Sequence, residues 1–461
     1  MIRLAIVLLA TLVALFLYWR KPMAYVSFTL WVWFLVPLVR RLIDWKIGWA
    51  EPNYVLLTPL LVSSVSALAF LVPNRNRPMR ILPTFFLCTL AIIYGFAIGL
   101  LTHPSAEAVY GLFNWMAPIL FGMYLALSSR DYPRLRRCIE HNITAGAAFM
   151  GIYGIYQFLT APAWDTFWLE NISEGLIDPS FGQPSPFKIR VWSSLNGPGP
   201  FANVMLALLL LLFVSKVRLK LPASMLGYVA LMLSVVRTAW LDFGLGFLLL
   251  MRGERPSRIL KLLAAAGVIA IVLVPVVQSP NLAPLLGSRF RSFYNLHQDE
   301  SFRERQEMYK VIGAIIEHDP FGHGLLNTEI DHNLVVDSGV LIMLLQLGWV
   351  GTALYGIGVL TFLIKPSGNV HVPIDTGSGP PEKPGAIATA THYEEDRMPL
   401  ATRSVCIAYL AQLVGGLIFV SASGMIFWMC MGMASCAAHW QQLQQEGAAT
   451  PEPLRRKLRA L

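Results

Sequence analysis

The sequence predicts an all-α, polytopic membrane protein with 12 or 13 transmembrane helices. Of its 461 residues, 55% are hydrophobic and only 14% are charged, whereas about a quarter of the residues of a soluble domain carry charge. Apolar runs recur along the chain at close to the roughly 20 residues that a helix needs to cross a bilayer. Both observations indicate a chain that is largely embedded in lipid.

Each apolar run is expected to form one helix, and together they account for most of the chain. They lie at residues 4–19, 23–39, 54–72, 81–101, 110–127, 139–159, 198–214, 222–236, 238–251, 259–277, 335–364, 404–421 and 424–441. The first run lacks a small-residue cleavage motif, and a second apolar run follows it at once. We therefore expect it to remain as a helix and not to be removed as a signal peptide.

Basic residues set the expected orientation, because cytoplasmic loops collect Lys and Arg. One set of loops holds 24 of the 36 Lys and Arg residues, and the opposite set holds 11. The richer side is therefore expected to be cytoplasmic, with the loops at 160–197 and 278–334 facing out. The net charge of +9 is explained by this asymmetry. The expected partner is the lipid bilayer, and we expect no nucleic-acid binding.

The helices and loops divide the chain into four parts. The expected parts are N-terminal transmembrane helices at 1–277, a large outward loop at 278–334, C-terminal helices at 335–441 and a basic tail at 442–461. Within the third part, residues 365–402 are rich in Gly, Pro and charge, so we expect a disordered cytoplasmic loop. The sequence contains no phosphate-binding glycine motif and no CxxC pair, so no cofactor and no metal site are expected.

The large outward loop is expected to contain a helix of its own. Ser301 and Glu304 have the spacing of a capping box, and the helix should run to about Glu317. One face of it would carry Phe302, Arg305, Tyr309, Ile312 and Ile316. Arg305 is therefore expected to lie against the apolar body of the protein.

Arg237 stands between two apolar runs, at the outer membrane face by the orientation above. An arginine at this depth is costly unless it is paired or faces a polar cavity. The alternative is an arginine that extends to the interface beside Trp240, an aromatic-belt residue. Arg237 and Arg305 are expected on the same side, where two arginines can clamp a diphosphate by bidentate hydrogen bonds.

His332 lies just before a helix that re-enters the membrane. A histidine can take a proton near neutral pH, which suits a general base acting on a sugar hydroxyl. The alternative is a polar residue that caps the helix near Asn333. Asp337 would either orient His332 or cap the same helix with Ser338.

Three further residues are candidate glycan contacts. Arg190 and Trp192 lie in the outward loop 160–197, and Tyr309 lies in the loop helix. Aromatic rings stack on sugar faces, but tryptophan is equally expected at a membrane interface.

In the order of these residues, the chain resembles the O-antigen ligase/polymerase superfamily of bacterial envelope glycosyltransferases. The matching elements are Val236-Arg237-Thr238-Ala239-Trp240, Arg305 with Tyr309, Pro320-Phe321-Gly322-His323-Gly324, His332-Asn333 and Gly348-Trp349-Val350-Gly351. The chain departs from the family pattern at Val236, where a serine often precedes the arginine.

The resemblance implies a GT-C-like helical fold in the bacterial inner membrane and an inverting, metal-independent transfer at the periplasmic face. The donor would be an undecaprenyl-diphosphate-linked glycan, with Arg237 and Arg305 on the diphosphate and His332 activating the acceptor hydroxyl. Asp337-Ser338-Gly339-Val340 resembles exopolysaccharide polymerases, which favours a polymerase of repeat units working with a flippase and a chain-length regulator. The alternatives are a ligase to lipid A-core or protein and a non-catalytic glycan transporter. Because the apolar runs are nearly free of charge, an enzyme is favoured over a transporter.

Overall fold

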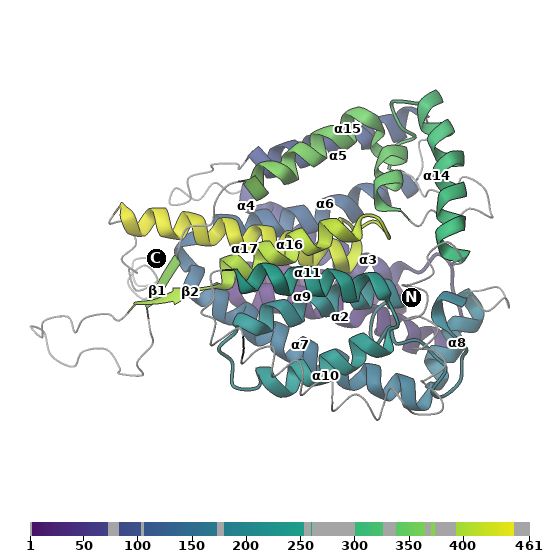
Figure 1. Cartoon of the computed structure of the whole chain (residues 1–461), viewed down its shortest axis with the longest axis horizontal. Coiled ribbons are helices and arrows are strands. Elements are labelled where there is room, and N and C mark those ends of the chain that lie inside the picture. The colour runs from purple at the N-terminus through teal and green to yellow at the C-terminus, as the bar shows by residue number, and fades with distance from the viewer. Residues whose placement is uncertain are drawn as a thin grey trace, which may run out of the picture.

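The computed structural model is almost entirely helical, and it confirms the predicted all-α, multi-pass membrane fold (Figure 1). It describes residues 2–71, 83–102, 106–172, 179–252, 260, 300–325, 338–364, 370–373 and 393–446. For residues 300–308 it describes the helix but not the side chains. The predicted helix at 259–277 and the tail beyond residue 446 lie outside this description, apart from Leu260, which is helical.

Six helices in the described part of the chain are long and apolar enough to cross a membrane. They are α1 (Ile2–Arg20), α2 (Pro22–Ile47), α5 (Pro83–Thr102), α6 (Ala106–Leu127), α15 (Gly339–Ile364) and α17 (Ser421–Gln445). The longest described helix, α7 (Tyr132–Thr160), carries polar residues in its first turns.

Shorter helices complete the bundle. These are α3 (Leu57–Ser64), α4 (Leu68–Leu71), α8 (Ala163–Ile172), α9 (Pro198–Val214), α10 (Lys220–Leu233), α11 (Arg237–Met251), α14 (Glu300–His318) and α16 (Met398–Gln412). The 3-10 turns η1 (Tyr54–Leu56) and η2 (Val65–Ala67) join α3 and α4 into the segment predicted as one helix at 54–72.

The bundle is built around α9 and α17, which are buried along most of their lengths. Every residue from Phe201 to Leu212 is buried, as expected for a helix that is apolar on all sides. α17 packs on α6 and α16, α7 packs on α10, and α5 packs on α15. In Figure 1 these helices run side by side, with α8 and α14 at one end of the bundle and the two strands at the other.

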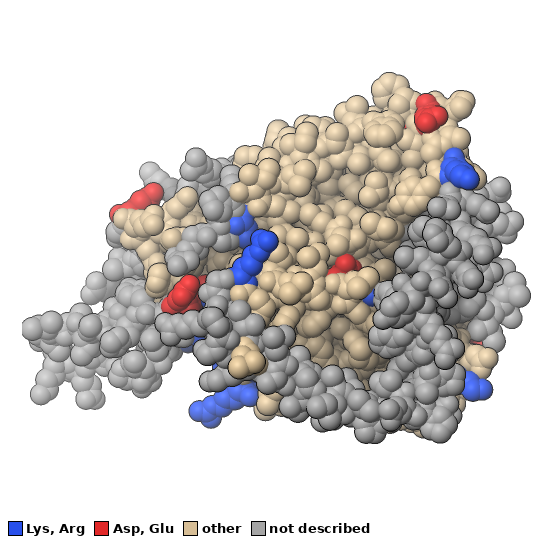
Figure 2. All heavy atoms as spheres, in the orientation of Figure 1, with Lys and Arg blue, Asp and Glu red and all other residues tan. Residues whose placement is uncertain are grey.

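Most of the described charged side chains lie away from the middle of the bundle. Figure 2 shows a broad uncharged surface across the centre of one face, interrupted by an acidic side chain near α11, with most of the described Lys, Arg, Asp and Glu towards the ends. This arrangement is the one expected for a protein whose central band contacts lipid tails.

The segment predicted to be disordered at 365–402 contains two short strands. β1 (Val370–Pro373) pairs antiparallel with β2 (Tyr393–Asp396). Asp396 accepts a hydrogen bond from the hydroxyl of Tyr132 and forms an ion pair with Arg136, and both of these residues lie in α7. These buried contacts hold the end of the segment against the bundle, which its composition alone does not reveal.

The boundaries of α16 and α14 differ from those predicted. The apolar run 404–421 is not one helix, because α16 ends at Gln412 and an irregular turn occupies 413–420. That turn contains Gly416 at φ +151°, a conformation that favours glycine. Likewise α14 begins at Glu300, so Ser301 is already helical and does not occupy the predicted cap position.

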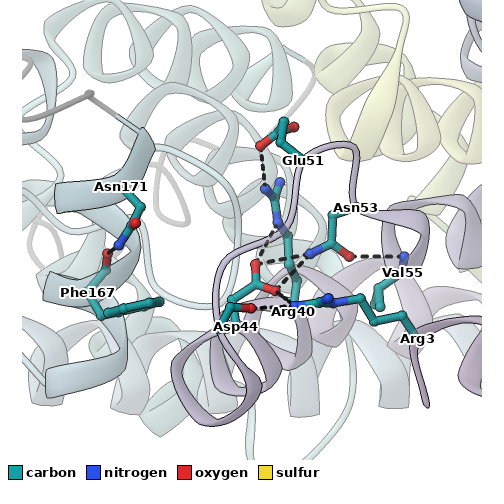
Figure 3. A network of polar contacts seen from close by, with 9 residues as sticks. Arg3, Arg40, Asp44, Glu51, Asn53, Val55, Phe167 and Asn171 are labelled. Atoms are coloured by element: carbon teal, nitrogen blue, oxygen red, sulfur yellow. Dashed lines mark hydrogen bonds and ion pairs between the residues drawn. The ribbon is translucent and has the colours of Figure 1, made fainter. Parts of the chain in front are cut away.

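The N-terminal hairpin is fastened by a polar network at the end of the bundle near α8 (Figure 3). Asp44 of α2 accepts from Arg3 at 2.9 Å, from Arg40 at 3.3 Å and from Asn53 at 2.9 and 3.0 Å. Arg40 also reaches Glu51 at 3.1 Å. Because Asp44 is fully buried, several donors are needed to offset its desolvation, and together they hold α1 beside α2.

Candidate functional site

Arg237 is the first residue of α11 and follows a tight turn after α10. The turn, Ser234 to Val236, contains Val235 at φ +56°. A β-branched residue in the left-handed region is a genuine conformational outlier. The side chain of Arg237 is half-buried. Arg237 therefore stands between two apolar helices, as predicted, and only the turn Ser234 to Val236 separates them.

Arg190 holds this turn in place. Its Nε donates to the carbonyl of Ser234 at 3.1 Å, and its Nη2 donates to the carbonyl of Val235 at 3.0 Å. The next residue, Val191, donates its backbone N–H to Leu233 at 3.1 Å. The side chain predicted to contact a glycan is thus engaged by backbone carbonyls of the turn before Arg237.

Trp192, another predicted glycan contact, is fully buried in the protein core. Its ring lies edge-on to Phe181, with centroids 5.1 Å apart, and 6.0 Å from the ring of Trp168. A ring with no exposed face cannot stack on a sugar in this structure. The prediction is corrected here, and the reason is that the loop at 182–197 folds back into the bundle.

A buried ion pair that the sequence did not reveal anchors this loop. Arg41 of α2 donates to Asp165 of α8 at 2.6 Å and to the carbonyl of Ser193. Asp165 also accepts from Tyr153 at 2.8 Å and from Gln157 at 2.7 Å. Arg41 and Asp165 are both 0% exposed, so each depends on the other for compensation of its charge.

The sequence feature that could have predicted this ion pair lies at the end of α2. The apolar run there stops at residue 39, whereas the helix continues through Arg40 and Arg41 to Ile47. Adjacent arginines in a continuing helix could have been interpreted as partners for the acidic residues of the loop 160–197.

The start of α11 is also held from its other side by α16. Gln412, the last residue of α16, donates its side-chain Nε2 to Thr238 Oγ1 at 3.2 Å. Gln412 is only 4% exposed, and its Oε1 has no hydrogen-bond partner among the residues that the structure describes. The contact places the turn after α16 directly beside the residue that follows Arg237.

The same turn contacts the start of α15. The backbone N–H of Gly339 donates to the carbonyl of Leu413 at 2.8 Å. One residue earlier, Ser338 Oγ lies 2.9 Å from the hydroxyl of Tyr309 in α14. A continuous set of contacts therefore connects the first turn of α11 with α14.

α14 lies with its apolar side on the first part of α15, as its sequence pattern predicted. Ile312 and Ile316 are 1% and 3% exposed and form a small core with Leu341 and Leu345. Arg305 lies in the same helix, one turn before Tyr309. Its side chain lies outside the described residues, so its predicted contact with the apolar body stays a prediction.

The run predicted as one helix at 335–364 is broken at Gly348. This residue has φ +60° and ψ −172° inside α15, and Figure 1 shows α15 bending sharply near α14. The turn after α14 supplies the missing hydrogen bonds: Trp349 N–H donates to Pro320 at 3.0 Å, and His323 N–H donates to Leu345 at 2.7 Å.

His332 and Asp337 lie outside the described residues, and their predicted roles remain predictions. Asp337 directly precedes Ser338, and so directly precedes the contact with Tyr309. In the ranges that the structure does describe, no group of three or more His, Cys, Asp or Glu residues is arranged to hold a metal ion.

Comparison with known proteins adds the family. No curated protein matches the chain. The sequence model of a family described as O-antigen ligase matches residues 204–356, about a third of the chain, from α9 into α15. This region contains Arg237, Arg305, His332 and the Gly348 break, and the family supports a membrane glycosyltransferase activity of the ligase or polymerase type. The chain is therefore a multi-pass membrane protein that is similar, over residues 204–356, to the O-antigen ligase family.

Proposed function

We propose that the protein polymerises undecaprenyl-diphosphate-linked oligosaccharide repeat units into exopolysaccharide or O-antigen at the periplasmic face of the inner membrane. The observation that carries the proposal is the set of contacts from α11 to α14. It runs from Thr238 through Gln412 and Gly339 to Ser338 and Tyr309. The helix that begins with Arg237 and the helix that contains Arg305 are thereby joined at one end of the bundle.

In the proposed reaction, the oxygen of an acceptor hydroxyl attacks the anomeric carbon of the donor glycan from the side opposite the diphosphate. The bond between that carbon and the phosphate oxygen breaks, and its electron pair leaves with the lipid diphosphate. The hydroxyl proton passes to His332, which acts as the general base. Arg237 and Arg305 bind the diphosphate and stabilise the charge that it gains, by charge-assisted hydrogen bonds.

The acceptor distinguishes a polymerase from a ligase. A polymerase adds the growing glycan to a second lipid-linked repeat unit, whereas a ligase transfers it to lipid A-core or protein. The ligase alternative is favoured by one observation, the description of the matching family as O-antigen ligase. Both reactions use the same donor and would require the same arginines.

The experiment supplies purified protein with lipid-linked repeat units extracted from the producing cells, in the presence of a chelator. Longer glycan chains on the lipid are the expected product. Growth only when lipid A-core is added would identify a ligase, and loss of all activity on chelation would contradict the metal-independent mechanism.

Arg237→Ala and Arg305→Ala are expected to abolish product while protein amounts in the membrane stay unchanged. The matched control is Lys310→Ala, which removes an exposed positive charge from the same helix as Arg305. Normal product from both arginine variants would overturn the diphosphate clamp.

A further inference from the structure

We propose that Arg190 is a positioning residue for Arg237. The proposal rests on the function proposed above and deepens it. Arg190 would touch no substrate. It would act by fixing the turn from which Arg237 is presented to the lipid-linked diphosphate.

The first support is the set of carbonyls at the end of α10. The last carbonyl groups of a helix have no partner inside the helix. Leu233 accepts from the backbone N–H of Val191, while Ser234 and Val235 accept from the Arg190 guanidinium. One planar side chain thus fixes two consecutive peptide groups of the turn before Arg237, those of the Ser234 and Val235 carbonyls, a geometry for which the fork of an arginine is suited and a lysine is not.

The second support is the backbone of Val235. At φ +56° it occupies a region that costs free energy for a β-branched residue. Such a conformation persists only where the surrounding structure enforces it, and it is concentrated at functional sites. Arg190 donates to the carbonyl of Val235 itself, two residues before Arg237, so it is placed to enforce this conformation.

The third support is the firm attachment of Arg190 to the bundle. Its backbone N–H donates to Phe181 at 2.9 Å. Two and three residues further on, the backbone N–H groups of Trp192 and Ser193 donate to Gln157 Oε1 at 3.0 and 2.8 Å. Since Gln157 is fully buried in α7, the guanidinium extends from a fixed base.

The turn is held at a second point beyond Arg237. Gln412 donates to Thr238, and Trp240 Nε1 donates to the carbonyl of Leu231 at 3.3 Å. With Arg190 on the preceding residues, the backbone on both flanks of Arg237 is fixed. Preorganisation of this kind is what a group that binds a developing charge requires.

The test measures transfer from the extracted lipid-linked repeat unit by purified Arg190→Gln and Arg190→Lys. Both are expected to lower kcat/KM for the lipid donor about 10- to 100-fold, as for a misplaced binding group. The matched control is Lys188→Gln, which removes an exposed positive charge two residues away and is expected to have wild-type kcat/KM. Thermal unfolding in detergent shows whether each variant folds. If Arg190→Gln does not fold, the kcat/KM of the more conservative Arg190→Lys variant tests the proposal.

Two combined variants separate positioning from a general structural role. In an Arg237→Lys background, Arg190→Gln is expected to cause little further loss, because it acts through Arg237. Val235→Gly is expected to restore part of the activity of Arg190→Gln, since glycine adopts positive φ without strain.

Equal losses from Arg190→Gln in the two backgrounds would overturn the proposal, as would wild-type kcat/KM in both Arg190 variants while Arg237→Ala is inactive. If Arg237→Ala itself is fully active, the proposed function fails, and the role of Arg190 fails with it. The Arg237→Ala result therefore tells the two failures apart.

Discussion

Gly322 lies directly against Gly348, and neither position has room for a β-carbon. A β-carbon at Gly322 would collide with the backbone of Gly348, and one at Gly348 would collide with the backbone of Phe321. The turn after α14 is thereby inserted into the break in α15. This contact fixes the end of α14, and so the helix that contains Arg305, on the membrane-embedded bundle.

The first prediction concerns this contact. Gly348→Ala is expected to lower the free energy of unfolding by about 1–3 kcal/mol, because alanine is strained at φ +60° and its β-carbon meets the Phe321 backbone. Gly356→Ala in the same helix is the control, since no atom of the described part of the chain lies within 4 Å of its β-carbon. Thermal unfolding in detergent checks both, and equal stability of the two variants would contradict the prediction.

The sequence predicted most helices correctly because their apolar runs end at polar or helix-breaking residues. α9 coincides with its predicted range, and α14 carries Ile312 and Ile316 inward as its periodicity required. Two of the missed helix ends lie inside apolar sequence: at Gln412 and at Gly348 the hydrophobic run continues while the helix stops. Hydropathy cannot detect a break of this kind, because the groups that form hydrogen bonds with the interrupted helix come from another part of the chain.

The candidate site was predictable in part for the same reason. Arg237 was recognisable because a charge between two apolar runs is unusual. The role of Arg190 could not be predicted, because its partners at Ser234 and Val235 are 44 and 45 residues away and are backbone carbonyls without a sequence signature. The prediction for Trp192 was wrong because the sequence of an outward loop does not show whether an aromatic ring in it faces a sugar or packs into the core.

The second prediction concerns the buried pair of Arg41 and Asp165. Asp165→Asn is expected to lower the free energy of unfolding by about 3–5 kcal/mol, because it leaves the Arg41 charge buried without a counter-ion. Glu170→Gln changes an exposed carboxylate in the same helix and is expected to be neutral. The amount of folded protein in the membrane and its melting temperature measure both effects.

A paired replacement tests the cause. Arg41→Met combined with Asp165→Leu removes both charges, so its loss of stability is expected to be smaller than that of Asp165→Asn alone. A larger loss in the double variant would show that packing, and not the unpaired charge, accounts for the effect.

The third prediction concerns Tyr309 and Ser338. Tyr309→Phe removes the hydrogen bond of 2.9 Å but keeps the ring, which is 41% exposed. The expected loss is about 0.5–1.5 kcal/mol in the free energy of unfolding. Ser338→Ala is expected to cost less, because it leaves unpaired the hydroxyl of the exposed Tyr309, whereas Tyr309→Phe leaves unpaired the hydroxyl of the fully buried Ser338.

Activity measurements distinguish the hydrogen bond between Tyr309 and Ser338 from the proposed contact of the Tyr309 ring with a glycan. If the Tyr309 ring stacks on a sugar, Tyr309→Ala should lower transfer well beyond Ser338→Ala, while Tyr309→Phe should not. Equal activity of Tyr309→Ala and Ser338→Ala would remove Tyr309 from the candidate glycan contacts.

The fourth prediction concerns the two partners in the contact between α16 and α11, which are not equivalent. Gln412 Oε1 is buried and accepts no hydrogen bond from any described residue, so Gln412→Leu removes this unpaired acceptor together with the bond to Thr238. The two effects oppose each other, and the free energy of unfolding should change by less than about 1 kcal/mol. Thr238→Val instead leaves the amide N–H of Gln412 buried without an acceptor and should cost about 1–3 kcal/mol. Chemical or thermal unfolding of the two variants checks the order, and a Gln412→Leu variant less stable than Thr238→Val would contradict it, since the bond itself would then outweigh the cost of the buried, unpaired amide.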